Sequence, residues 1–301
     1  METITPEEYW EAIPKVMYYM DEPLADASCV ALYFVNNIAH EQVKVCLSGE
    51  GADEFFGGYN IYHEPLALNG YQKIPKCLRK IAASSAKKLP NIKGKNFLIR
   101  GSKSVEERFI GNANIFSEEE KKKILKNQKY INSPQELLKK YYNQVQELDD
   151  ISKMQYIDIK NWLPGDILLK ADKMGMANSI EVRVPYLDKR VFEIAKQIPS
   201  NLKVINTITK ITFRNVANKY LPQQTAEKKK LGFPTPIRVW LKEDKYYNIV
   251  KKTFNSKIAE KYFYIDELNK LLNDHKNGKI DNSRKIWTLY VFLVWYQVYF
   301  E

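Results

Sequence analysis

Cysteine and histidine are scarce in this 301-residue chain, which argues against two kinds of stabilising cross-link. The three cysteines, Cys29, Cys46 and Cys77, are too few and too scattered to form a disulfide framework. The three histidines lie far apart in the sequence and offer no zinc-ligand spacing. We therefore expect no zinc site, and we expect a reducing compartment, the cytoplasm.

Long hydrophobic runs are also missing. The most apolar stretch, residues 286–300, contains Gln297 and is shorter than the ~20 residues that a membrane-spanning helix needs. Residues 1–8 are polar and acidic, the opposite of a signal peptide. We expect no membrane partner, and we predict that residues 286–300 form a terminal helix buried against the core.

The net charge is +11, and lysine supplies most of it. A basic balance can indicate nucleic acid, but the sequence has no basic stripe with interleaved aromatics and no zinc finger. We therefore interpret the lysines as solvated side chains and expect no nucleic-acid partner.

Several helix starts are well marked. Thr5, Ser117 and Ser133 each precede a segment with a glutamate at the third helical position, which is the capping pattern. We predict a helix from Thr5 toward residue 20, and a second one over residues 27–40.

Residues 43–59 are the most informative stretch. Residues 43–47 are apolar and rich in β-branched side chains, which predicts a strand buried on both faces. Residues 48–51 form a turn with two glycines, and residues 52–56 predict a short helix that ends at Gly57 and Gly58. A strand, a glycine turn and a helix start together favour an anion site.

Three carboxylates in this stretch restrict the choice of anion. Glu50, Asp53 and Glu54 would repel a bare phosphate, whereas a magnesium–phosphate complex accepts carboxylate ligands. The local chemistry therefore favours a magnesium nucleotide or pyrophosphate. The alternative is an acidic helix start that only complements the helix dipole.

Two later regions are dense in charged residues. Residues 163–166 predict a turn, residues 167–176 a helix, and Glu181 and Arg183 would point to one side of an extended segment. Four side chains here form either a buried ion network or a supporting shell for an active site: Asp172, Glu181, Arg183 and Asp188.

In the second region, Lys210 and Arg214 are four residues apart on a predicted helix and so share one face. Residues 228–230 are three lysines before a Gly-Phe-Pro turn, from which a lysine could reach an anionic centre. The alternative for this run is a solvated charge cluster.

Four motifs resemble those of the glutamine-hydrolysing asparagine synthetases, in the same order. Residues 48–59 resemble the family's S-G-E-G-A-D-E-x-F-G-G-Y signature. The other three stretches are residues 21–28, residues 172–188, which resemble D-K/R-M-x-M-A-x-S-x-E-x-R-V-P-F/Y-L-D, and residues 230–234. The motifs lie between residues 21 and 234, and the resemblance extends over nearly the whole chain.

The resemblance implies a two-step reaction with ATP and Mg²⁺. Aspartate would be activated to β-aspartyl-AMP, and ammonia would then release asparagine. The implied nucleotide contacts are Ser48, Gly49 and Gly51, and the implied metal ligands are Asp53 and Glu54. Glu50 would serve adenylate formation and breakdown, and Lys230 would act on the phosphates.

The sequence departs from this family in two respects. Glu2 follows Met1, where the family has a cysteine nucleophile, and no Ser-Gly-Gly phosphate loop occurs. We therefore expect one partial synthetase domain over residues 1–301: mostly α, the C-terminal portion of an α/β adenine-nucleotide α-hydrolase-like (PP-loop) domain with few strands. Residues 1–70 would be the remnant of the nucleotide-binding core and residues 71–301 the helical part.

Such a domain would be incomplete on its own, and would need a complementing N-terminal chain or dimerise over an exposed sheet edge. Two alternatives remain open. One is a non-catalytic fragment or a subunit of a split synthetase. The other is an amide-forming ligase of the same fold, either β-lactam synthetase-like or peptide-cyclising.

Overall fold

The computed structural model describes residues 3–90, 92–112, 114–129, 133–228, 232–233 and 235–301. Helices form nearly all of the regular structure in these ranges, and the two strands are three residues each. This confirms the prediction of a mostly helical chain with few strands.

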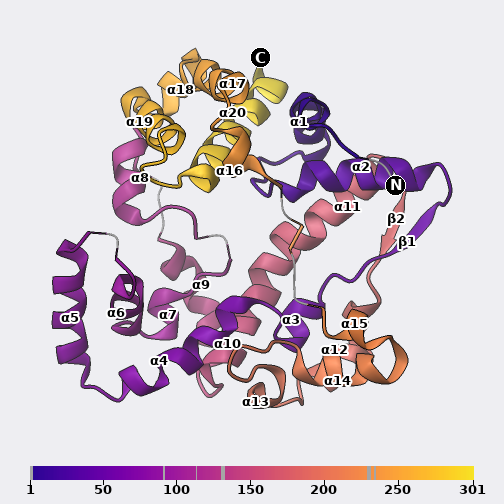
Figure 1. The fold of residues 1–301 in the computed structure, drawn as a ribbon, viewed down its shortest axis with the longest axis vertical. Coiled ribbons are helices and arrows are strands. Elements are labelled where there is room, and N and C mark those ends of the chain that lie inside the picture. Colours follow the sequence, from indigo (N-terminus) through magenta and orange to yellow (C-terminus); the bar gives the residue numbers. More distant parts are fainter. Residues whose placement is uncertain (1–2, 91, 113, 130–132, 229–231, 234) are drawn as a thin grey trace.

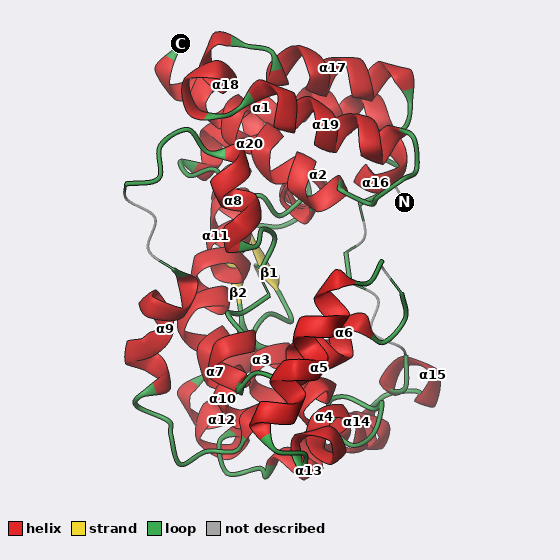
Figure 2. Ribbon diagram, turned by 90° about the vertical axis from the view of Figure 1, so that its left-hand side faces the viewer, coloured by secondary structure: helices red, strands yellow, loops and turns green. Residues whose placement is uncertain are grey.

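The helices form two groups (Figure 2), and a long helix runs between them (Figure 1). The upper group contains α1 (Pro6–Met20), α2 (Ser28–His40), α8 (Glu118–Ile124), α16 (Ile237–Trp240), α17 (Asp244–Phe254), α18 (Lys257–Tyr262), α19 (Ile265–Lys276) and α20 (Ser283–Phe300). The lower group contains α3 (Ala52–Phe56), η1 (Asn60–His63), α4 (Glu64–Gln72), α5 (Lys76–Lys88), α6 (Lys95–Gly101), α7 (Val105–Arg108), α9 (Pro134–Tyr142), α10 (Asp150–Ile157), α12 (Lys189–Ala195), α13 (Ser200–Lys203), α14 (Ile211–Tyr220) and α15 (Gln223–Ala226).

The predicted helix starts are confirmed. The Thr5 hydroxyl accepts a hydrogen bond from the Glu8 amide, and the Glu8 carboxylate accepts one from the Thr5 amide. Ser117 makes the same reciprocal pair at α8, and Ser133 caps α9 with its hydroxyl. Helix α2 begins at Ser28, within one residue of the prediction. These short-range bonds satisfy backbone groups that every helix end leaves free.

The C-terminal helix is buried, as predicted. Seven of its apolar side chains lie in the largest core cluster, which α1, α2, α17 and α19 also line. Trp10 from α1 stacks on Tyr246 with ring centroids 5.0 Å apart, and Trp287 from α20 meets Trp10 edge-on. Among the described residues, no helix combines the length and the hydropathy that crossing a bilayer requires.

The helix between the two groups corrects one prediction. Residues 163–166 are not a turn, because α10, a π-helix (η2, Asp158–Leu168) and α11 (Leu169–Met176) follow one another without a break. Pro164 lies inside the π-helix. Proline removes one N–H and crowds the preceding turn, and the wider π-type winding accommodates it.

The strands β1 (Val45–Leu47) and β2 (Glu181–Arg183) form a parallel pair, with Val45 opposite Glu181. The strand is not buried on both faces as its composition alone predicts: Val45 is 41% and Leu47 75% exposed, which is the exposed surface expected of a partial sheet. Its apolar residues suit a larger sheet, whereas within the described residues the sheet has only two strands.

Candidate active site

Both signature segments leave the sheet at the same edge. The Ser48 amide donates to the Arg183 carbonyl over 2.8 Å, so the ladder continues to the last residue of each strand. The glycine turn follows β1, and the segment through η3 (Pro185–Leu187) follows β2. The carboxyl ends of parallel strands are where α/β proteins bind ligands.

The glycine turn is shaped by the loop after β2. Gly51 has a φ of +85°, and a Cβ there would lie 2.1 Å from a methyl carbon of Leu187. Gly57 ends α3 with a φ of +73°, as predicted for the end of this helix. The turn therefore requires glycine for its conformation and for close packing against Leu187.

Asp53 is paired with a lysine that is distant in sequence. The ammonium of Lys210 lies 2.8 Å from the Asp53 Oδ1, and both side chains are mostly buried. This ion pair lies directly beside Gly58, where a Cβ would be 1.8 Å from the Asp53 Oδ1. Lys210 itself caps α14 with a φ of +54°, an uncommon conformation for a side chain of this size.

Glu54 points into the protein rather than into solvent. It is 1% exposed, and its Oε1 accepts a hydrogen bond of 2.5 Å from the Tyr59 hydroxyl. Trp162 Nε1 in turn donates to that hydroxyl over 3.2 Å. Gln155 from α10 donates to the Glu54 carbonyl over 2.6 Å. Helix α3 is thus held by side chains of the long helix α10–η2.

A cavity of about 450 Å³ opens beside this turn. Its wall contains residues from the turn and helix after β1 and from three other parts of the chain: Asp26, Ser28, Leu32, Glu50, Gly51, Asp53, Glu54, Tyr59, Ile167, Lys170, Gly232 and Phe233. Of the predicted site residues, Glu50, Gly51, Asp53 and Glu54 meet here, and Ser48 and Gly49 lie in the turn just before them.

Lys170 joins two carboxylates at one side of the cavity. Its ammonium pairs with Asp26 and lies 3.2 Å from Asp166, and the lysine is 8% exposed. Burial raises the pKa of Asp166 to about 7. Burial alone would also raise the pKa of Asp26, but the Lys170 charge holds it below its ordinary value. The net charge of Lys170, Asp26 and Asp166 together therefore becomes more negative as Asp166 ionises near neutral pH.

The four residues interpreted as either a buried ion network or a supporting shell do not form a buried network, and none of them lines this cavity. Asp172 is exposed on α11, and Glu181 pairs with Arg183 over 2.8 Å at the surface. Asp188 caps α12 through the Arg190 amide and pairs with the Arg190 guanidinium. The last pairing lowers the pKa of Asp188 to about 2. Exposed carboxylates stay hydrated, so ion pairs at the surface contribute little to the stability of the fold.

Lys230 lies outside the described residues. Gly232 and Phe233, which follow it closely in sequence, line the cavity with Glu50 and Asp53. The proposed role of Lys230 thus stays a prediction, and the neighbouring residues are compatible with it.

Magnesium fits the donor set of this cavity. Mg²⁺ takes oxygen ligands, and in nucleotide sites one or two carboxylates with substrate phosphates suffice. Asp53 offers a carboxylate at the cavity wall, and Glu50 lies three residues before it. The described residues contain no group of three or more potential ligands that could hold a metal by themselves. Bound phosphates would therefore have to complete the coordination.

Several residues in this arrangement carried little sequence signal. Gln155 and Trp162 reach the site from a segment with no recognisable motif, and Asp26 and Lys170 are 144 positions apart. Lys210 stood out only by its spacing to Arg214. The spacing of residues along a helix could not have predicted that Lys210 pairs with Asp53.

Comparisons with known proteins agree with this arrangement. The asparagine synthase family model matches residues 2–297. The chain belongs to the asparagine synthase family. It is 46% identical over 299 residues to asparagine synthetase (glutamine-hydrolyzing) 1 of Bacillus subtilis, covering 99% of this chain and 47% of that protein.

Two other relatives are similar to most of this chain. A putative asparagine synthetase (glutamine-hydrolyzing) of Mycobacterium bovis is 40% identical over 99% of this chain and 46% of its own length. An amidase, chyE of Penicillium rubens, is 24% identical over 79% of the chain and 36% of its own length. The chain thus spans about half the length of the synthetases that it matches. Membership of the asparagine synthase family supports an ATP-dependent ligase role.

Proposed function

We propose that this chain supplies active-site residues for the ATP-dependent synthesis of asparagine from aspartate and ammonia. The observation that carries the proposal is the cavity where Glu50 and Asp53 meet Lys170 and the segment after Lys230. The names of the Bacillus and Mycobacterium relatives support the same reaction.

In the first step, the side-chain carboxylate of aspartate attacks the α-phosphorus of ATP. A phosphorus–oxygen bond forms, the bond to the β-phosphate bridge breaks, and pyrophosphate leaves with its electron pair. The leaving pyrophosphate gains charge, which cations near the cavity stabilise. We assign this work to Lys210, already held beside Asp53, and to Lys230.

Asp53 would bind Mg²⁺ together with the pyrophosphate oxygens. Magnesium would neutralise charge on the phosphates when it is bound. Lys210, whose ammonium lies 2.8 Å from the Asp53 Oδ1, would supply a second positive charge beside the phosphates. Glu54, buried under Tyr59, would fix the turn that carries Asp53 and would take no direct part in metal binding.

In the second step, ammonia attacks the acyl carbon and AMP leaves. The attacking nitrogen must lose a proton, and Glu50 is a half-buried carboxylate on the cavity wall that could accept it. The Ser48, Gly49 and Gly51 backbone would lie along the nucleotide, where the absence of bulky side chains allows close approach.

The exposed strand suggests how the site is completed. Leu47 and Val45 present an apolar face to solvent beside a sheet edge that no other described strand pairs with. We propose that a complementing polypeptide with a Ser-Gly-Gly phosphate loop, or a second copy, covers this face. Ammonia from glutamine would then come from a domain outside these 301 residues.

A second candidate function is amide formation on a different acceptor. The similarity of the chain to an amidase favours this candidate, because it indicates that relatives of this chain differ in activity. The lysines at residues 228–230 do not indicate which acceptor the chain uses. A non-catalytic subunit is the third candidate, and it predicts no turnover under any condition.

Aspartate-dependent exchange of labelled pyrophosphate into ATP tests the proposal. The exchange should appear when the chain is mixed with a polypeptide carrying the Ser-Gly-Gly loop, and should fall at least a hundredfold in Asp53→Asn. Exchange with another carboxylic acid in place of aspartate would favour the second candidate. No exchange with any acid and any complementing polypeptide would contradict a catalytic role.

A further inference from the structure

One segment carries almost all of the net positive charge. Residues 65–105 contain ten lysines and arginines and no aspartate or glutamate, so they contribute +10 of the chain's +11. All ten cations lie in residues 73–103, which form α5, α6 and the turns beside them and which we call the basic hairpin. It lies at the outer edge of the lower helix group, far from β1 and β2 (Figure 1).

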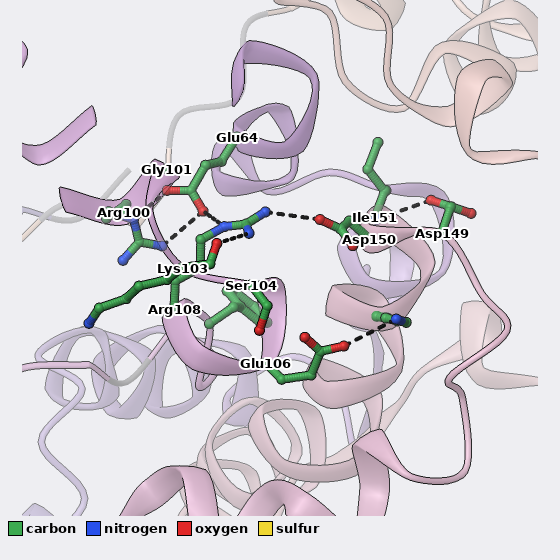
Figure 3. A network of polar contacts seen from close by, with 12 residues as sticks. Glu64, Arg100, Gly101, Lys103, Ser104, Glu106, Arg108, Asp149, Asp150 and Ile151 are labelled. Carbon is green, nitrogen blue, oxygen red and sulfur yellow. Dashed lines mark hydrogen bonds and ion pairs between the residues drawn. The ribbon is translucent and has the colours of Figure 1, made fainter. Parts of the chain in front are cut away.

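The two arginines of the segment are used to anchor it. Arg79 donates to the Ile74 and Gly101 carbonyls, which ties α5 to the end of α6. Arg100 pairs with Glu64 of α4, and the same carboxylate accepts from the buried Arg108, which reaches Asp150 (Figure 3). The hairpin is therefore rigidly joined to the body of the protein.

The lysines, by contrast, face solvent. Seven of the eight are exposed, and Lys95 is half-buried: Lys73, Lys76, Lys80, Lys87, Lys88, Lys93, Lys95 and Lys103. Among the described contacts, only Lys76 has a carboxylate near it, Glu107 at 3.6 Å. The exposed surface of the hairpin therefore has a high density of uncompensated charge.

Aliphatic side chains are exposed among these lysines. On α5 they form a stripe one turn apart, with Leu78 at 54% and Ile81 at 64% exposure, and Ile74 extends it. Leu89 and Ile92 continue the apolar surface into the connection between the two helices. No core element of the described chain covers this stripe.

We propose that the basic hairpin docks the protein onto an anionic lipid surface. Lysines supply attraction to lipid headgroups, and the aliphatic stripe enters the boundary between headgroups and acyl chains. The expectation of no membrane partner rested on the lack of a spanning segment and of a signal peptide, and neither bears on docking at a membrane surface. Docking of this kind does not depend on the catalytic proposal.

The composition of the surface favours lipid over two other anionic partners. Single-stranded RNA is bound by stacking on aromatic rings and by arginine, whereas the exposed cations here are all lysine and Phe97 is the one exposed aromatic ring in the described part of the hairpin. Protein interfaces are depleted of lysine and enriched in arginine. A second copy of the same surface would be repelled by its charge.

Flotation with vesicles tests this inference with the full chain. Vesicles of 70% phosphatidylcholine and 30% phosphatidylglycerol should bind the protein, and pure phosphatidylcholine vesicles should bind it at least tenfold more weakly. The triple variant K80E/K87E/K88E should lose at least tenfold in affinity. The matched variant K252E/K257E/K270E reverses three exposed lysines elsewhere and should stay within twofold of the wild type.

Insertion of the stripe has its own readout. Cys77 is exposed beside Leu78, so a polarity-sensitive dye on it, in a Cys46→Ser background, should shift to the blue on anionic vesicles. L78S/I81S should abolish that shift and weaken binding at least threefold while the melting temperature is kept. Equal loss in both charge variants, or a 20-nucleotide poly(U) bound more tightly than the vesicles, would overturn the proposal.

Discussion

The ammonium of Lys210 lies 2.8 Å from the Oδ1 of Asp53, and the backbone of Gly58 passes directly beside both. The two side chains come from separate segments, one on the signature helix and one at the start of α14. Lys210 holds a left-handed conformation there, which costs about 1 kcal/mol and persists only where surrounding contacts require it. The pair therefore holds a cation beside the Asp53 carboxylate, which lines the cavity.

Gly58→Ala should separate this pair. The new Cβ would lie 1.8 Å from the Asp53 oxygen and 2.3 Å from the Lys210 Cε, so one of them must move. We expect magnesium pyrophosphate to bind at least tenfold more weakly, measured by calorimetric titration. The control is Gly70→Ala on α4, where no atom lies within 4 Å of the added methyl. Unchanged binding in Gly58→Ala would show that the pair is not part of the site.

Tyr59→Phe should loosen the turn without removing a ligand. The variant loses the hydroxyl that donates to Glu54 and accepts from Trp162, which leaves a buried carboxylate with one fewer hydrogen bond. Such a loss costs about 1–3 kcal/mol. We expect a lower free energy of unfolding in urea titrations. Tyr264→Phe, on an exposed tyrosine at the start of α19, should leave it unchanged.

Asp158→Asn should change how stability depends on pH. Burial raises the pKa of Asp158 to about 7, although the Tyr62 hydroxyl donates to it over 2.6 Å. The folded state therefore holds a proton between pH 4 and 7 that the unfolded state has released, and stability falls as pH rises through this window. Each pKa unit is worth about 1.4 kcal/mol, so the total is a few kcal/mol.

An asparagine at position 158 has no proton to lose, and its carbonyl can still accept from Tyr62. We expect the variant to gain stability relative to the wild type between pH 5 and pH 8, measured by urea unfolding at both values. An equal difference at the two values would show that Asp158 titrates normally.

We expect Arg108→Met to lower the stability of the lower helix group more than any other single substitution near the basic hairpin. Arg108 is 3% exposed and bonds Glu64, Asp150 and the Lys103 carbonyl (Figure 3). Removing one partner of a buried ion pair costs about 3–5 kcal/mol, because the remaining carboxylate stays buried. The control is Arg190→Met, in a pair at the surface, for which we expect no measurable change. Equal thermal denaturation curves for both variants would contradict the assignment.

The features predicted correctly from sequence are those set by neighbours along the chain. Thr5 and Ser117 cap helices through bonds to residues three positions away, and Gly57 ends α3 because few other residues adopt its conformation. The signature residues Glu50 and Asp53 also meet at one cavity, because a single turn carries both.

The features that could not be predicted from sequence depend on tertiary contacts. Residues 163–166 have the composition of a turn, yet packing of the long helix against α3 keeps Pro164 helical. The apolar residues of β1 predict a buried strand, but Leu47 faces solvent within the described structure. The Lys210–Asp53 pair and the packing of Leu187 on Gly51 depend on contacts over long sequence separations, which no local pattern encodes.

The most direct measurement is a calorimetric titration of the chain with magnesium pyrophosphate. The central claim is that Asp53 and its neighbours form a site for the phosphates of a magnesium nucleotide. We predict measurable binding by the wild type, a loss of at least tenfold in Asp53→Asn, and no change in Asp172→Asn, whose carboxylate is exposed on α11. Absent binding in the wild type, or equal affinity in all three proteins, would contradict the claim.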